Sequence, residues 1–299
     1  MKTSKSPNAV ACVAYETSKR VLPPYRHKFS PQKFTQAQLA TLLILKEFFT
    51  TDYRGIVEIV QDSSDLRKIL DLGIVPHYTT LQKASREILR KKQVKKLLKE
   101  TICLAEEEGI LIKTSTLSAM DSTGMESGHT SRYFIKRRAK GETEQYQRTT
   151  YKRFPKLVLA CDTITHLITG ALGMRGPSPD VVHFKPLIKE MLDTHEPRTL
   201  LADAGYDSEE SHRYAREDQG LHSIIPPKIG RPTKKLPSGK YRREMATSFD
   251  RETYGQRWQS ETVMSMIKRN LREEVFAKSY QAQIREMMLK VLTHNVSIV

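Results

Sequence analysis

Two apolar runs in the middle of the chain stand almost end to end, and this spacing limits the folds that the chain can adopt. Residues 156–162 (KLVLACD) and 164–172 (ITHLITGAL) both read as buried strands, with a single residue between them. A parallel pair needs a crossover connection of about a dozen residues or more, whereas an antiparallel pair closes through a short turn. We therefore expect an antiparallel hairpin in this region.

The segments on either side of the hairpin extend it into a sheet. Apolar runs typical of strands stand at 117–123, at 199–203 and around Ile224. Helical patterns begin at Pro179 and Ser208, between these strands, and a long helix is expected at roughly residues 253–275. Three strands followed by alternating helices and strands favour a mixed sheet with helices on its faces, which is an α/β fold.

The N-terminal third of the chain lacks strand patterns. Residues 1–30 are polar, and we expect a flexible basic arm there. Residues 31–112 carry helical patterns, with Thr35 as one cap and a long basic helix that begins at Thr79 or Thr80. Short helices that end in a basic one resemble a helix-turn-helix arrangement, which binds DNA. A helical bundle that packs on the next domain or serves dimerisation fits the same pattern.

The chain is strongly basic, with 50 Lys and Arg against 34 Asp and Glu and a formal net charge of +16. Such an excess attracts polyanions, because each neutralised phosphate releases condensed counterions. The alternative is a basic surface without a specific partner. The basic residues gather in blocks at 83–99, 132–156 and 228–243, and this clustering favours several contacts with a nucleic-acid backbone.

Several protein classes are excluded by simpler features. Cys12, Cys103 and Cys161 lie far apart and form no CxxC pair, so a zinc ribbon or a disulfide framework is not expected and any metal should be bound through oxygen. No run of about 18 apolar residues could span a membrane, and the N-terminus is too polar for a secretory signal. We expect a cytoplasmic protein without a membrane partner.

Two aspartates stand at the ends of expected strands. Asp121 follows the apolar run LSAM, and Asp203 follows the run LLA and precedes a glycine-containing turn. Each aspartate alone is also typical of a residue that closes a turn. In open α/β sheets, however, functional sites gather at the ends of strands, and this favours both aspartates as residues of a cleft.

A third pattern is carried by the expected long helix. Tyr254, Arg257, Glu261 and Lys268 fall within an arc of about 60° on a regular helix, and Arg272 joins the same edge. A solvated charged face explains the spacing of Arg257 and Glu261 by i,i+4 pairing, but it gives Tyr254 and Lys268 no reason to share that edge. Trp258, on the same helix, is interpreted as a packing residue.

These segments resemble insertion-sequence transposases of the DDE type. The signature of that family is Tyr, two residues, Arg, three residues, Glu, six residues, Lys, and it stands unbroken here as YGQRWQSETVMSMIK. The segments AMDSTGM and LLADAGYDSEE look like the first and second aspartate motifs of the family, and residues 53–82 are similar to the helical region that precedes them. The resemblance covers roughly residues 35–295.

The resemblance implies a fold and a set of site residues. The fold is an RNase H-like mixed sheet flanked by helices, at residues 113–299, preceded by an all-helical N-terminal domain. The implied catalytic residues and metal ligands are Asp121, Asp203 and Glu261. The implied DNA-binding residues are Tyr254, Arg257 and Lys268, to which the helical spacing adds Arg272.

The chain departs from some relatives between its second and third acidic residues. The 57 residues from 204 to 260 leave no room for the large β-insertion of some relatives. No tryptophan lies between Asp203 and Tyr254, a region in which some relatives carry a tryptophan that traps a flipped base.

The resemblance also implies a cofactor and partners. Two Mg²⁺ ions, for which Mn²⁺ should substitute, suit a site made of carboxylates, which would repel one another without bound cations. The expected partner is double-stranded DNA with terminal inverted repeats, bound by a homodimer that pairs the two ends. A protein bound to DNA in this way would be associated with the nucleoid.

The leading hypothesis is therefore a DNA transposase that hydrolyses phosphodiester bonds and transfers strands at the ends of a mobile element. One alternative is a transposase-derived DNA-binding protein that is catalytically silent. Another is an RNase H-like metal-dependent nuclease, which would leave Tyr254, Arg257 and Lys268 without a clear task.

Overall fold

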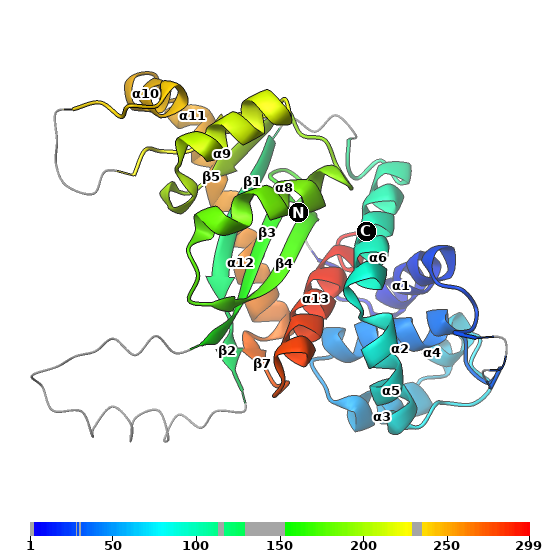
Figure 1. The fold of residues 1–299 in the computed structure, drawn as a ribbon. Coiled ribbons are helices and arrows are strands. Elements are labelled where there is room, and N and C mark those ends of the chain that lie inside the picture. Colours follow the sequence, from blue (N-terminus) through cyan, green and yellow to red (C-terminus); the bar gives the residue numbers. More distant parts are fainter. Residues whose placement is uncertain (1–2, 28, 30, 113–116, 129–152, 229–234) are drawn as a thin grey trace, which may run out of the picture.

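The computed structural model combines a helical N-terminal region with a five-stranded sheet (Figure 1). It describes residues 3–27, 29, 31–112, 117–128, 153–228 and 235–299. Most of the basic block at 132–156 and part of the block at 228–243 lie outside the described residues. The expected fold class, a mixed sheet of the RNase H-like type flanked by helices and preceded by helices, is confirmed.

Over the described residues, the sheet contains two antiparallel and two parallel pairings in the order β4-β3-β1-β5-β6. The strands are β1 (Leu117–Gly124), β3 (Phe154–Asp162), β4 (Ile168–Gly176), β5 (Thr199–Ala202) and β6 (His222–Ile224). β3 runs antiparallel to both β1 and β4, whereas β5 runs parallel to both β1 and β6. The expected hairpin is thus confirmed as β3 and β4, although β4 begins four residues later than the apolar run that predicted it.

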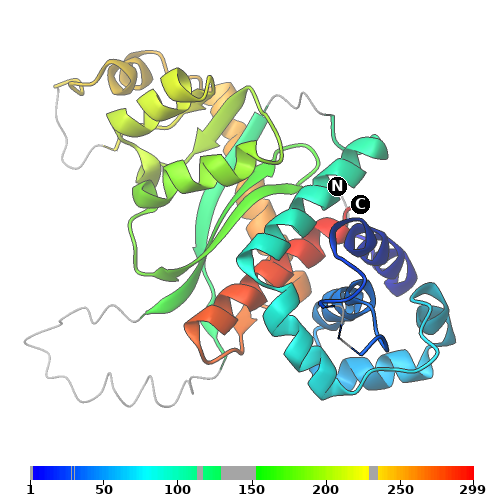
Figure 2. The ribbon, with the colours of Figure 1, turned by 45° about the vertical axis from the view of Figure 1, so that its right-hand side comes forward.

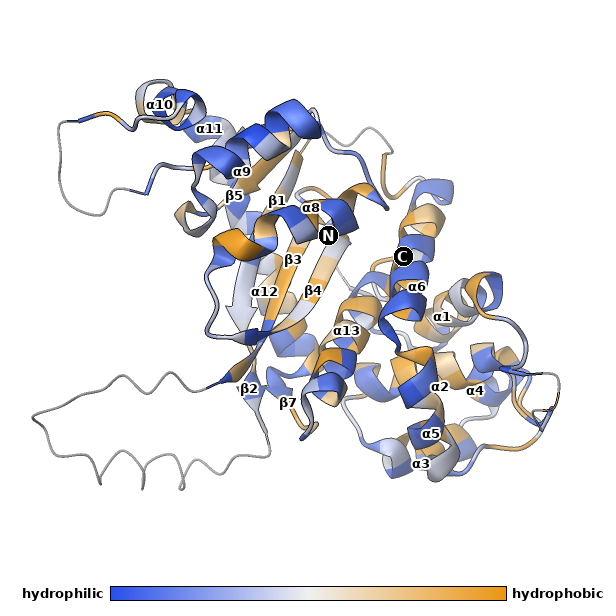
Figure 3. Ribbon diagram, viewed as in Figure 1, coloured by the Kyte–Doolittle hydropathy of each residue, from blue (hydrophilic) through white to orange (hydrophobic). Residues whose placement is uncertain are grey.

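Because side chains alternate between the two faces of a strand, the sheet is buried on both sides. Helices α8 (Phe184–Leu192) and α9 (Glu209–Arg213) lie over one face, and α12 (Trp258–Leu271) and α13 (Tyr280–Val296) lie over the other (Figure 1). Residues 157, 159 and 161 of β3 pack beneath α12 and α13, and residues 158 and 160 pack beneath α8. Figure 3 shows the resulting apolar colour along β3 and β4.

In the N-terminal region, the described residues form six helices. They are α1 (Pro7–Val21), α2 (Gln36–Phe48), α3 (Tyr53–Asp62), α4 (Ser64–Ile69), α5 (Tyr78–Ile88) and α6 (Lys91–Glu107). Thr35 caps α2 as expected, in a capping box with Gln38. The long basic helix expected from Thr79 or Thr80 is wrong in detail, because His77 caps α5 and the chain breaks between α5 and α6 at Leu89 and Arg90.

The expectation of a flexible arm at residues 1–30 is also wrong. Helix α1 lies there, capped by Ser6, and it buries Val10, Ala11 and Ala14 completely in the core of the helical region. Its apolar residues are small and few, so the segment read as polar. The backbone N–H of Ser4 donates to the oxygen of Ser297 at 2.6 Å, and both views show the two ends of the chain close together (Figures 1 and 2).

Helix α13 joins the helical region to the sheet and was not anticipated from the sequence. Its Met287 and Val291 pack under the sheet, whereas Leu289 and Leu292 pack among the N-terminal helices. A helix that is apolar on several sides shows no single stripe, because it is buried between two units. The proposed domain boundary near residue 113 separates the helices from the sheet along the sequence. Helix α13, however, packs against both the N-terminal helices and the sheet.

Part of the basic block at 83–99 serves the protein itself. The Lys95 ammonium contacts Glu190 at 3.2 Å and also bonds Asp193, both at the end of α8 or just beyond it. Lys91 lies 4.0 Å from the same Glu190 carboxylate. These two lysines tie α6 to α8, so they are less available for a nucleic acid than the sequence block indicates.

The remaining elements are short. They are β2 (Glu126–Ser127), η1 (Asp180–His183), η2 (Ala204–Tyr206), the π-helical turn η3 (Tyr214–Asp218), α10 (Lys240–Thr247), α11 (Arg251–Tyr254), η4 (Gly255–Arg257) and β7 (Glu274–Val275). The helix expected at 253–275 is thus divided into α11, η4 and α12, and it stops at Leu271. Within the described ranges, no helix is both long and apolar enough to span a bilayer.

The buried His294 makes stability depend on pH. It is 2% exposed, its Nε2 lies 3.0 Å from the oxygen of His166, and burial lowers its pKa to about 4. An unfolded histidine takes up its proton near pH 6.5, so the neutral buried form stabilises the fold fully above that pH and progressively less as the pH falls towards 4. We predict that His294 alone costs about 2 kcal/mol of unfolding free energy between pH 7 and pH 5.

Urea unfolding of the protein and of His294→Gln at these two pH values measures this cost. The glutamine amide retains a donor for His166 but takes up no proton, so the variant should lose about 2 kcal/mol less on acidification. An identical loss in both proteins would contradict the assignment.

Candidate active site

The sheet register brings Asp121 and Asp203 together. Met120 of β1 pairs with Ala202 of β5 in parallel register, so the next residue of each strand is an aspartate at the same carboxyl edge. Neighbouring strands lie about 4.8 Å apart. Two aspartates that are 82 positions apart in the sequence therefore stand on adjacent strands.

The alternation of side chains sends both aspartates to the same face. Ala119 and Leu201, which are paired and stand two residues earlier, both belong to the core beneath α12. Because side chains two positions apart share a face, Asp121 and Asp203 are directed towards α12 as well. Asp121 is half-buried there and Asp203 is exposed.

Arg257 connects Asp121 to Glu261. It ends η4, which lies against β1 and β5, and α12 begins at the next residue. Its Nη1 lies 3.4 Å from Oδ2 of Asp121, and its Nη2 donates to Oε1 of Glu261. The guanidinium thus lies between two of the three predicted acidic residues and links β1 to the first turn of α12.

The electrostatics show that the three carboxylates share one environment. Burial raises the pKa of the Asp121 carboxyl above its ordinary value, and the negative charges of Asp203 and Glu261 raise it further. Two groups lower the same pKa. The backbone N–H of Ser122 donates to Asp121 Oδ1 at 2.7 Å, and the Arg257 guanidinium carries a positive charge. A group of like charges of this kind favours a bound cation.

Tyr254 also belongs to this group. The Arg257 guanidinium lies 6.0 Å from the centre of its ring, which packs edge-on against Phe249. Burial raises the pKa of the Tyr254 phenol, and the charges of Asp203 and Asp121 contribute to the rise. The structure therefore brings Tyr254, Arg257 and the three acidic residues to one edge of the sheet.

The two other predicted DNA-binding residues, Lys268 and Arg272, differ in their position relative to α12. Lys268 stays on α12, seven residues beyond Glu261 and therefore close to the same helix face, and makes no ion pair with any described residue. Arg272 does not share that face, because α12 ends at Leu271 and Arg272 turns the chain with φ 64°. The expectation that Arg272 extends the signature edge is wrong for this reason. Trp258, expected to pack, is 54% exposed.

Within the described part of the chain, no three His, Cys, Asp or Glu side chains are arranged to hold a metal ion. Asp121 and Glu261 instead share the guanidinium of Arg257. The donor set still fits a hard divalent cation, since it consists of carboxylate oxygens and the charges of Asp203 and Glu261 raise the pKa of Asp121. Asp121, Asp203 and Glu261 are the residues that could hold such an ion.

Asp180, at the start of η1, was not identified from the sequence. Its Oδ1 accepts from Ser122 Oγ at 2.6 Å and from Lys156 Nζ at 2.7 Å. A Cβ on Gly205 would stand 2.9 Å from its Oδ2, so Asp180 also packs against the turn that follows Asp203. It therefore contacts the segments that carry both aspartates. The sequence feature that could have indicated Asp180 is Lys156. It is a charged residue in an apolar strand, and a buried charge requires a partner.

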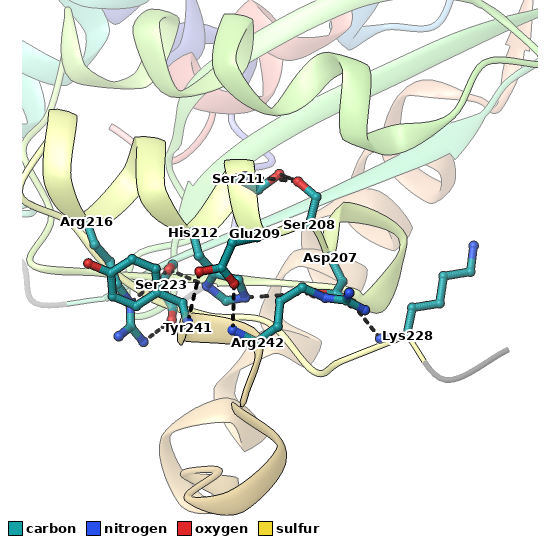
Figure 4. A network of polar contacts seen from close by, with 10 residues as sticks. All are labelled: Asp207, Ser208, Glu209, Ser211, His212, Arg216, Ser223, Lys228, Tyr241 and Arg242. Carbon is teal, nitrogen blue, oxygen red and sulfur yellow. Dashed lines mark hydrogen bonds and ion pairs between the residues drawn. The ribbon is translucent and has the colours of Figure 1, made fainter. Parts of the chain in front are cut away.

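A second polar network fixes the segment that leads to Tyr254 (Figure 4). The buried Asp207 accepts from the backbone N–H of Lys228 at 2.7 Å and from two nitrogens of Arg242. Glu209 accepts from the backbone N–H groups of Tyr241 and Arg242, both at 3.1 Å. The carboxylate of Asp207 thus contacts both ends of the basic segment from 228 to 242.

Comparisons with known proteins give one family and one similar solved structure. A family model described as the transposase DDE domain matches residues 113–296. No curated protein is similar enough to the chain to match it. Among solved structures, the cryo-EM structure of the piggyBac transposase synaptic complex with hairpin DNA is similar with a TM-score of 0.46 and 10% identity, over 97% of this chain and 71% of that chain.

The contact between Asp180 and Lys156 predicts a large effect on stability. Lys156 is only 6% exposed, so Asp180→Ala leaves a buried ammonium without its counter-ion and should lower the free energy of unfolding by roughly 3 kcal/mol. The double variant Lys156→Met with Asp180→Ala should recover most of that loss, because no buried charge remains. Urea unfolding measures both, and a single variant as stable as the unaltered protein would contradict the prediction.

Proposed function

Because the chain belongs to the transposase DDE domain family, we propose that it cuts DNA at the ends of a mobile element and transfers the cut strands to a target. The family match over residues 113–296 confirms the resemblance of the chain to DDE transposases. The proposal adds that Asp121, Asp203 and Glu261 are the catalytic acidic residues and the ligands of Mg²⁺, for which Mn²⁺ substitutes.

The observation that carries the proposal is that these three residues share one edge of the sheet, where the Arg257 guanidinium contacts two of them. Asp121 and Asp203 follow paired residues of adjacent parallel strands, and Arg257 contacts both Asp121 and Glu261. Three carboxylates have no structural need to gather on a partly exposed edge, where the charges of Asp203 and Glu261 raise the pKa of Asp121. Binding of a divalent cation by these carboxylates would explain why they lie together.

Asp121, Asp203 and Glu261 would hold the Mg²⁺ ions, which when bound would supply orientation of the attacking oxygen and stabilisation of charge on the leaving oxygen. The side chains around the carboxylates would then position the DNA. Lys268 has no ion-pair partner among the described residues, and Arg257 carries the charge that offsets Asp121 and Glu261. Once the carboxylates hold cations, we propose that Arg257 turns to the phosphate backbone together with Tyr254 and Lys268.

The proposed partner is double-stranded DNA with terminal inverted repeats. The net charge of +16 supplies the long-range attraction to phosphates. Pairing of two transposon ends requires at least two active sites, and a homodimer on DNA is the simplest assembly that provides them.

The test is cleavage of a plasmid that carries the repeats flanking the coding region, with Mg²⁺ or Mn²⁺. Asp203→Asn should slow cutting by more than about 100-fold, because even the outer partners of metal ligands cost 10–100-fold when lost. Binding of the same repeats in a mobility-shift assay should remain. Asp218→Asn, at an exposed aspartate of η3, is the matched control and should cut normally.

Three outcomes would contradict the proposal in different ways. Normal cutting by Asp203→Asn would remove that residue from the site. Cut DNA without joined products would indicate a nuclease, and binding without cutting under either metal would indicate a catalytically silent DNA-binding protein.

A further inference from the structure

A basic groove separates the helical region from the end of the signature helix. It has a volume of about 590 Å³. On one side it is lined by α2, the start of α3 and α5, and on the other by the segment joining α12 to α13 and by α13 itself. Four basic residues line it, Lys46, Arg86, Arg272 and Arg285, against two acidic residues, Asp52 and Glu286. Nothing in the catalytic site described above uses this groove.

The three arginines of the groove have no polar partner in the part of the chain that the structure describes. Among the residues that the structure describes, Arg86, Arg272 and Arg285 form no side-chain hydrogen bond and no ion pair. Arg86 and Arg272 are exposed, and Arg285 is half-buried. Lys46 differs, because its ammonium contacts Glu47 at 3.2 Å. Three guanidinium groups thus present their donors to the groove without an acceptor.

The two acidic residues of the groove are already engaged. Oδ1 of Asp52 accepts from the backbone N–H groups of Arg54 and Gly55, at 3.0 and 2.7 Å. The two oxygens of Glu286 accept from the N–H groups of Phe276 and Ala277, both at 2.9 Å. These carboxylates hold the walls of the groove in place, and none of the three arginines bonds to them.

The backbone at Arg272 directs this residue to the groove. Helix α12 ends where the buried Lys290 ammonium donates to the oxygen of Leu271, while the same ammonium contacts Glu47 of α2 at 2.8 Å. Arg272 follows with φ 64°, a conformation that a non-glycine residue adopts at a cost. Backbone strain of this kind gathers at functional positions, where the side chain is needed in one direction.

From these observations we propose that the groove binds the phosphate backbone of duplex DNA through Arg86, Arg272 and Arg285. The proposal rests on the proposed function for the identity of the polyanion. Planar guanidinium groups bind phosphate oxygens in pairs, which suits arginines without a protein acceptor. The groove would hold the DNA between the helical region and the catalytic domain, so that both contact one duplex.

Helix geometry places this contact relative to the cut. Arg272 stands 11 residues after Glu261, and a helix rises 1.5 Å per residue, so the groove begins about 16 Å from the catalytic carboxylate. At 3.4 Å per nucleotide this corresponds to about five nucleotides along the strand. A duplex that runs along α12 from the catalytic site would therefore meet the groove about half a helical turn away.

The test measures binding alone, in EDTA, with a fluorescein-labelled duplex of the flanking repeat and fluorescence anisotropy between about 50 and 200 mM salt. The double variant Arg86→Gln with Arg285→Gln should reduce the slope of log K against log salt by about 1.8, since each lost phosphate contact removes about 0.9. Arg86→Lys with Arg285→Lys keeps both charges and should retain most of the slope.

Arg67→Gln is the matched control, because Arg67 lies on α4 of the same helical region and lines no part of the groove. It should leave the slope unchanged. An unchanged slope in the double glutamine variant, or an equal fall in the control, would overturn the proposal. Because no metal is present and no cutting is measured, this result is independent of whether Asp203 is catalytic.

Discussion

The arrangement depends on the compensation of negative charge at one edge of the sheet. The parallel register of β1 and β5 places Asp121 beside Asp203, and α12 adds Glu261 on the same face. Coulombic repulsion between these groups contributes to the raised pKa of Asp121, after burial. Arg257 offsets part of that charge by contacting Asp121 and Glu261. Additional positive charge at this edge would stabilise the three carboxylates. In the proposed function, divalent cations supply that charge.

This arrangement requires α12 to be held at both of its ends. At its start, the segment leading to Tyr254 is fixed by Asp207 and Glu209, which bind the backbone and side chain of Arg242. At its end, the buried Lys290 bonds the oxygen of Leu271 and links it to the helical region. The helical region thus contributes to the geometry of the catalytic edge, although it contains none of the three acidic residues.

The sequence predicted the features that follow from local rules. The single residue between two apolar runs predicted the hairpin, and the ends of apolar runs located Asp121 and Asp203. It did not predict α1 and α13, because their apolar faces are defined by contacts with distant helices rather than by one stripe. The pairing of Asp180 with Lys156 and the left-handed turn at Arg272 also depend on tertiary contacts, so helical spacing alone misplaced Arg272.

The measurement that tests this account most directly is a crystal structure of the protein grown with Mn²⁺, in which anomalous scattering locates the ion. The account predicts manganese bound by oxygens of Asp121, Asp203 and Glu261, with the Arg257 guanidinium no longer on Asp121. Manganese bound elsewhere, with Arg257 still between Asp121 and Glu261, would contradict it.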